Sequence, residues 1–90
     1  VVMLFDKISI GSGRALRRPA DPKVDRQLRR LIAESNKTGD CIINDGAEYF
    51  RPGEDDDVAA EEYFAQERHR AREILRKVSR MQKSYDRRYQ

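Results

Sequence analysis

Arginine and lysine side chains recur at three- and four-residue spacings between residues 22 and 37. On a helix over this range, one side carries basic residues around a small one: Arg26, Arg29, Arg30, Ala33 and Lys37. Asp25 and Glu34 are expected at the edges of this face. Guanidinium groups can bond the O6 and N7 atoms of guanine, or phosphate oxygens. The uniform sign predicts a DNA-binding face, whereas a face that serves only solubility would mix both signs.

More basic side chains stand before this helix. Arg14, Arg17 and Arg18 lie in the segment "RALRR", and Lys23 lies at the start of the helix. Phosphate contacts of this kind fix the position of a protein on DNA without reading its bases. We therefore expect Arg14, Arg17 and Arg18 to be phosphate contacts, and Lys23 to be a further DNA-binding residue.

The residues typical of enzymes are not arranged for catalysis. His69 is the only histidine, and it stands between two arginines with no nucleophile suggested near it. The acidic run at 54–57 is explained by the favourable interaction of negative charge with a helix N-terminus, without a bound cation. The segment "GSGR" at 11–14 lacks the Lys-Ser/Thr ending of a phosphate loop. We expect no catalytic residue, metal, cofactor or small-molecule substrate.

Charge is segregated along the 90 residues, which suffice for one domain but not for a deep enzyme cleft. Residues 13–37 hold eight basic and three acidic residues, a net charge of +5. Residues 38–62 hold one basic and nine acidic residues, or −8, and residues 63–90 hold nine basic and three acidic residues, or +6. Two basic blocks separated by an acidic one favour a polyanionic partner.

Cysteine content and hydropathy bear on the compartment. Cys41 is the only cysteine, which indicates a reducing, cytoplasmic setting, and we expect it to point inward as a small core residue. The opening "VVMLF" is too short for an export signal or a membrane span. We expect no membrane association.

The segment 22–37 carries the clearest helix signals. Asp21 can cap the helix, Pro22 suits its first position, and Gly39 offers a left-handed stop. The apolar residues form one stripe opposite the basic face: Val24, Leu28, Leu31 and Ile32. This stripe predicts the side of the helix that packs on the core.

A β-hairpin is predicted directly after this helix. "CIIN" and "AEYF" flank Asp45-Gly46, a dipeptide suited to a type I′ turn, although a loop of three or four residues also fits. The two-residue turn would pair Ile43 with Glu48, Ile42 with Tyr49, and Cys41 with Phe50. The hairpin would then cover the apolar stripe of the helix, because a lone hairpin is marginal in water.

Two short helical segments are expected at the beginning of the chain. Met3, Leu4, Phe5 and Ile8 suit one face of a first helix that ends at Gly11–Gly13. Arg14–Arg18 can form a single helical turn before Pro19.

A long helix is predicted from about Val58 to Tyr85. Its apolar residues follow a seven-residue repeat that Glu67 interrupts. Because the body of the domain is short, the end of this helix should overhang, and we expect it to form a homodimer, with the helices antiparallel, through Ile74, Val78, Met81 and Tyr85.

The segment "VDRQLRRLIAESNKTGDCIINDGAEYFRP" resembles the small winged-helix proteins of bacterial prophages and mobile elements. In those proteins a "DRxLRRLI" helix precedes a short turn, a wing ending in "GYY" or "GYF", and a charged C-terminal helix. The resemblance implies an α+β, mostly α, winged helix-turn-helix fold that binds double-stranded DNA and regulates transcription. The sequence "ALRRPADPKV" departs from the pattern, since it leaves about one turn where the family has a full second helix.

These observations lead to one domain organisation and two functions. Residues 1–53 are expected to form the winged-helix core, and residues 54–90 a long charged helix of the same domain. The favoured function is a DNA-binding regulator that uses the 22–37 helix. The alternative is a protein-protein interaction or phage assembly module in which the long helix makes the contacts.

Overall fold

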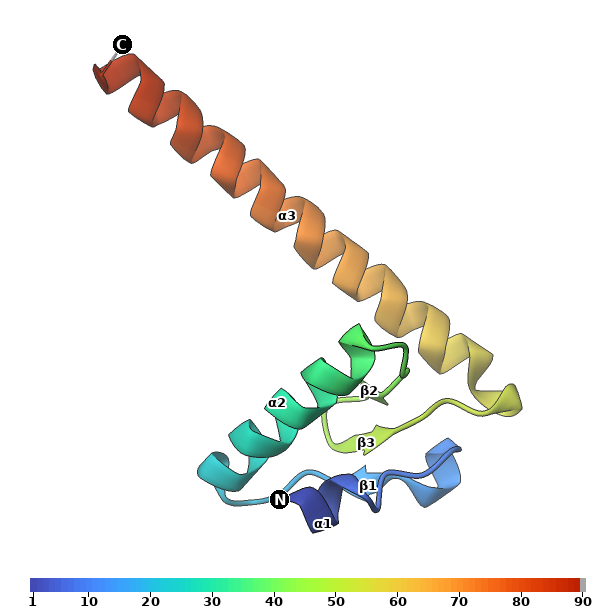
Figure 1. Cartoon of the computed structure of the whole chain (residues 1–90). Helices are drawn as coiled ribbons and strands as arrows, with labels where there is room; N and C mark the ends of the chain where they lie inside the picture. Colours follow the sequence, from blue (N-terminus) through green and yellow to red (C-terminus); the bar gives the residue numbers. More distant parts are fainter. Residues whose placement is uncertain (90) are drawn as a thin grey trace.

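The computed structural model describes residues 1–89 of the chain (Figure 1). Its helices are α1 (Val2–Phe5), α2 (Pro22–Lys37) and α3 (Asp57–Tyr89), and its 3₁₀ turns are η1 (Ser12–Arg14) and η2 (Glu54–Asp56). Its strands are β1 (Leu16–Arg17), β2 (Ile43–Asn44) and β3 (Glu48–Phe50). The chain is therefore mostly helical with one small sheet, as the α+β prediction requires. Within residues 1–89, no helix combines the length and apolar character needed to cross a bilayer.

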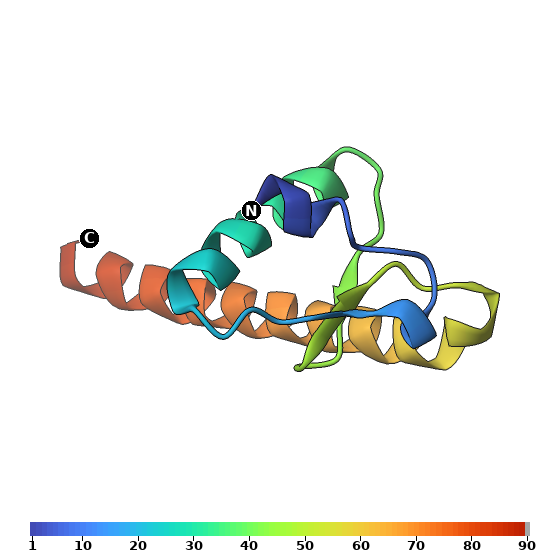
Figure 2. The same cartoon turned by 90° about the horizontal axis from the view of Figure 1, so that it is seen from below.

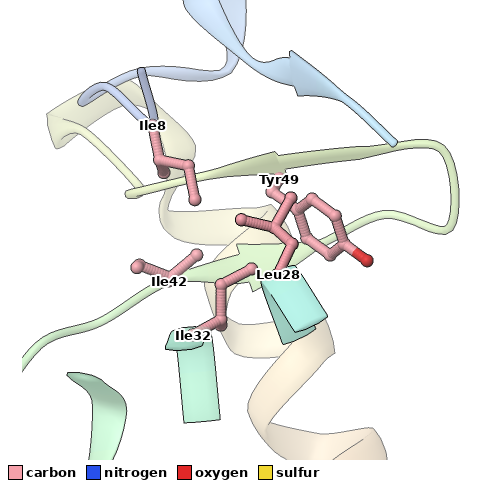
Figure 3. Packing of buried hydrophobic residues seen from close by; sticks show 5 residues of the cluster. All are labelled: Ile8, Leu28, Ile32, Ile42 and Tyr49. Atoms are coloured by element: carbon pink, nitrogen blue, oxygen red, sulfur yellow. The ribbon is translucent and has the colours of Figure 1, made fainter. Parts of the chain in front are cut away.

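The sheet is antiparallel, with strand order β1-β3-β2, and both of its faces are covered. On one face, Ile42 and Tyr49 pack against α2 in a buried cluster of Ile8, Leu28, Ile32, Ile42 and Tyr49 (Figure 3). Because side chains alternate along a strand, the neighbouring Ile43 and Phe50 point to the opposite face. They are also buried, on the side where α3 crosses β2. The small sheet is thus stabilised by a helix on each side.

Helix α2 begins and ends where its sequence signals predict. The Asp21 carboxylate accepts a hydrogen bond from the backbone N–H of Lys23 at 2.9 Å, and Pro22 is the first helical residue. Gly39 follows the helix with a φ of 105°, the left-handed conformation that ends it. Leu28 and Ile32 are buried, so the predicted apolar stripe does face the core.

Polar side chains at the end of α2 fasten the segment that leads into β2. The Asn36 amide accepts a hydrogen bond from the backbone N–H of Ile42 at 2.8 Å and donates one to its carbonyl at 3.0 Å. Ser35 donates to the Asp40 carboxylate at 2.6 Å. The two Asn36 bonds satisfy backbone groups of Ile42 that have no strand partner there.

A bidentate ion pair joins the turn after α2 to the end of β3. The Arg51 guanidinium donates through Nε and Nη2 to the two Asp40 oxygens at 2.9 and 2.7 Å. It also donates to the carbonyl of Ile8, and it lies over the ring of Phe5 with 5.8 Å between the guanidinium carbon and the ring centre. Arg51 therefore holds three segments of the chain together.

The predicted hairpin exists, but its predicted register is wrong. Ile43 pairs with Phe50 and Asn44 with Tyr49, so the turn is centred on Gly46-Ala47. The Asp45 carboxylate accepts hydrogen bonds from the N–H groups of Ala47 and Glu48, at 3.0 and 2.9 Å, which stabilises this longer loop. The register moves each pairing by two residues, so Tyr49 still shares a face with Ile42, and Phe50 with Ile43.

The beginning of the chain also differs from the prediction. Helix α1 has only four residues and ends at Phe5, and Ile8 is buried outside it. The helical turn predicted at Arg14–Arg18 is wrong, because Leu16 and Arg17 form strand β1, opposite Tyr49 and Glu48 of β3. Pairing with β3 satisfies backbone groups that a single isolated turn would leave without partners.

Helix α3 has 33 residues, and only its first part lies on the sheet (Figures 1 and 2). The Asp56 carboxylate before it accepts from the backbone N–H of Gly53 and from the N–H and hydroxyl of Ser12, at 2.9, 3.0 and 2.7 Å. The acidic run thus anchors the helix to the Gly11–Gly13 segment. From Ala71 to Tyr85 every residue of α3 is exposed, so the predicted overhang is present.

Candidate nucleic-acid interface

The basic residues of α2 lie together on the side away from the core. We call this set the α2 basic face: Arg26, Arg29, Arg30, Ala33 and Lys37, all exposed. Four of them, all except Lys37, line a hollow of about 610 Å³ between α2, β2 and α3. Lys37 stands at the last residue of the helix, beyond the hollow. The structure therefore gathers the residues that the sequence spacing placed on one face.

The charges of the α2 basic face differ in what they already contact. Lys37 Nζ lies 3.4 Å from Glu34 Oε1, and Arg29 Nη1 lies 4.0 Å from Asp25 Oδ2. Within residues 1–89, Arg26 and Arg30 form no salt bridge. Both basic side chains are exposed and both pairs are long, so the pairs contribute little and the face can exchange them for contacts to phosphate.

Asp25 lies at the edge of the face, beside Arg29, but it is buried. Its two oxygens accept hydrogen bonds from the Tyr49 hydroxyl at 2.6 Å and from Arg18 Nη2 at 2.8 Å. The Arg18 hydrogen bond lowers the pKa of Asp25. Burial, together with the hydrogen bond to Asp25, raises the pKa of Tyr49 to about 12. This network fixes the first turns of α2 against the sheet.

Arg18 is part of that network and is not available as a simple phosphate contact. Besides Asp25, its guanidinium donates to the carbonyl of Gly46 at 3.2 Å and lies over the ring of Tyr49. The other predicted DNA-binding residues of this part of the chain are exposed: Arg14, Arg17 and Lys23. Arg18 therefore has a structural role, whereas the other three side chains lie at the surface.

Two residues of the hollow were not among the predicted site residues. Arg70 of α3 and Asn44 of β2 line it together with the arginines of α2. Arg70 follows Tyr63 by seven residues, so both lie on the α3 side that turns toward the sheet. The seven-residue interval can be found in the sequence. The sequence does not show which face of α3 turns toward α2. Asn44 lies on β2, and its place beside the α2 arginines likewise depends on tertiary packing.

The tip of the hairpin is acidic and occupied by internal contacts. Asp45 holds the loop through its own backbone, and Gly46 accepts from Arg18. Phosphate would be repelled by Asp45 and Glu48. The hairpin therefore supports α2 and gives little prospect of direct contact with DNA.

The side chains considered for catalysis lie apart from one another. His69 is exposed on α3. Cys41 is exposed as well, contrary to the prediction, because Ile42 takes the inward position and is held there by Asn36. Within residues 1–89, no group of three or more histidine, cysteine, aspartate or glutamate side chains is placed to hold a metal ion.

In comparisons with known protein families, curated proteins and solved structures, nothing matches this chain.

Proposed function

We propose that this protein binds double-stranded DNA through the α2 basic face. The observation that carries the proposal is the pair Arg26 and Arg30, exposed and outside any ion pair of residues 1–89, on the side of a helix opposite its buried stripe. The major groove is about 12 Å wide and admits a single α-helix. Arginines on such a helix can bond guanine or phosphate.

The surroundings of α2 support this role. The first turns of α2 point away from α3, which crosses near the other end of α2 (Figure 1). Lys23 is exposed in the first turn of α2, and Arg14 and Arg17 are exposed in the segment before it, so in this proposal they supply phosphate contacts that position the helix. Arg70 adds positive charge from α3 at the opposite wall of the hollow.

We further propose that the fold is a reduced winged helix. In this proposal α2 is the recognition helix and the β2–β3 hairpin is the wing. The segment between α1 and α2, where a second helix would complete a helix-turn-helix, holds η1 and β1 instead. The resemblance of Val24–Pro52 to small prophage proteins supports a role as a cytoplasmic transcription regulator of a prophage or mobile element.

An interaction or assembly module is the second candidate function. The exposed end of α3 favours it, since an uncovered apolar stripe on a helix usually marks a contact. The two functions differ in which helix is required for binding. They can therefore be separated by substitutions in α2 and α3.

The test compares two charge-matched double variants on random-sequence duplex DNA. Arg26→Ala/Arg30→Ala removes two charges from the α2 basic face, and Arg72→Ala/Arg80→Ala removes two from the exposed part of α3. We expect the first variant to lose about tenfold or more in affinity and the second to lose much less. Both variants should remain folded, because alanine favours helix. Equal losses, or no binding by the unaltered chain, would refute the proposal.

A further inference from the structure

The exposed part of α3 carries an apolar stripe with a symmetric spacing. The stripe consists of Ile74, Val78, Met81 and Tyr85, whose exposed fractions are 52%, 52%, 62% and 57%. The spacing is four, three and four residues, which is the a/d pattern of a coiled coil. Read in either direction this spacing is the same. A second copy running the opposite way would therefore present an apolar residue at every position.

The same side of α3 is already covered nearer its start. Tyr63 and Phe64 are half-buried there, and Tyr63 lines a hollow with Ile43 and Phe50 of the sheet. Phe64, Ala71, Val78 and Tyr85 follow one another at seven-residue intervals, so the covered and uncovered parts form one face. The body of the protein thus uses the first part of the face and leaves the rest from Ala71 onward.

We propose that a second copy of this chain covers the stripe, with the two α3 helices antiparallel. A parallel copy would have to continue beside residues 57–70, where β2 already packs on α3. An antiparallel copy meets only residues 71–89, and its body lies beyond Tyr89 of the first copy. The position of the sheet therefore selects the antiparallel arrangement.

The repeat also defines the register of the pair. Opposing Val78 with Met81 of the second copy places Ile74 opposite Tyr85, so all four stripe residues meet apolar partners. At the edges of the contact, Lys77 then faces Ser84 and Leu75 faces Gln82. No like charges meet along these edges.

Most of the positive charge of this segment lies away from the stripe. At about 100° per residue, five basic residues fall on the far side of the helix: Arg72, Arg76, Arg80, Lys83 and Arg87. They stay in solvent when two copies pair, so their repulsion is moderate and screened by salt. The acidic start of α3 is not needed to offset it. The apolar stripe is complementary to the same stripe of a second copy. This favours a second copy over an acidic partner.

The overlap is short, so the dimer is expected to be weak. Residues 71–89 span under three heptads, fewer than an independent coiled coil usually has. The monomer and dimer should therefore exchange with protein concentration. Pairing of this kind does not depend on the proposed DNA-binding role, which rests on α2.

Equilibrium sedimentation of the intact chain tests the pairing. We expect the mean mass to rise toward twice 10.5 kDa as the protein concentration approaches about 100 µM. Val78→Glu/Met81→Glu should remain monomeric. Ala65→Glu/Ser79→Glu, which makes the same charge change at two other exposed positions of α3, should still dimerise. A monomeric intact chain, or a dimeric Val78→Glu/Met81→Glu variant, would overturn the proposal.

Disulfide trapping tests the orientation. Chains with Ile74→Cys and chains with Tyr85→Cys are mixed, both carrying Cys41→Ser. The antiparallel register brings position 74 of one copy opposite position 85 of the other, so mixed disulfides should form. Two copies of position 74 would lie about 16 Å apart along the helix, too far to be bridged. Disulfides between like chains would overturn the antiparallel arrangement.

Discussion

The Tyr49 hydroxyl donates a hydrogen bond of 2.6 Å to the Asp25 carboxylate, which joins the middle strand of the sheet to the first turns of α2. Both residues are buried, and Arg18 completes the network from the segment after β1. The α2 basic face is therefore oriented by a buried charged group at the edge of the face on the same helix. This arrangement makes the position of the face sensitive to changes in the core.

Removing the Tyr49 hydroxyl tests this network. Tyr49→Phe keeps the ring and leaves Asp25 one hydrogen bond short, so we expect the free energy of unfolding to fall by about 1–3 kcal/mol. Urea denaturation monitored by circular dichroism measures the change. Tyr63→Phe is the control, because Tyr63 is only half-buried and makes no side-chain hydrogen bond within residues 1–89. Equal effects of the two substitutions would show that the Tyr49–Asp25 bond contributes nothing.

Stability should fall in acid because of Asp40. The hydrogen bonds from Arg51 and Ser35 hold the pKa of Asp40 well below its usual range. A carboxylate with a depressed pKa in the folded state stabilises the fold above its unfolded pKa of about 3.9, and this contribution is lost as pH falls further. We expect little change in melting temperature from pH 7 to 5 and a steep decrease below about pH 4.

Asp40→Asn is the matched variant for the acid transition. It should be less stable at pH 7, because Arg51 loses its charged partner, and its stability should depend less on pH below 4. Asp45→Asn, at an exposed loop position, should keep the acid dependence of the unaltered chain. An unchanged pH profile in Asp40→Asn would assign the acid transition to other carboxylates.

A side chain at position 46 should destabilise the protein, although there is space for one. Its φ is 98°, and a Cβ built there meets nothing within 4 Å. Any loss of stability in Gly46→Ala therefore comes from backbone strain, which we expect to cost about 1 kcal/mol or more. Gly13→Ala, also without neighbours but without a positive φ, should be neutral or slightly stabilising. Equal melting temperatures for both variants would contradict the turn geometry.

Elements with local signals could be predicted from the sequence, and those that depend on distant partners could not. The bounds of α2 follow from Asp21, Pro22 and Gly39, which act within a turn of the helix. Strand β1 exists only because β3, far along the chain, pairs with it. The hairpin register shifted because the Asp45 side chain stabilises a different turn from the one its dipeptide favours.

The residues of the candidate site also differ in whether the sequence alone could predict them. Helical spacing was enough to place Arg26, Arg29 and Arg30 on one face. It could not show that Asp25 would be buried, since its partners Tyr49 and Arg18 come from β3 and from the segment after β1. Nor could it show that Arg70 would join the hollow, because the crossing of α3 over the sheet is a tertiary feature.

Arg70 provides the last test, since it extends the proposed DNA surface from α2 onto α3. Arg70→Ala loses only an exposed pair with Glu67, at 3.5 Å, so the fold should be unaffected. If Arg70 contacts phosphate, the slope of log affinity against log salt should become shallower by about 0.9. Arg72→Ala removes an equal charge two residues away, about 200° around the helix, and should leave the slope nearly unchanged.

Binding isotherms on duplex DNA across a range of salt concentrations measure both slopes. A shallower slope in Arg70→Ala alone would mean that bound DNA reaches the hollow between α2 and α3. Equal slopes in the two variants would confine the DNA contacts to α2 and the segment before it.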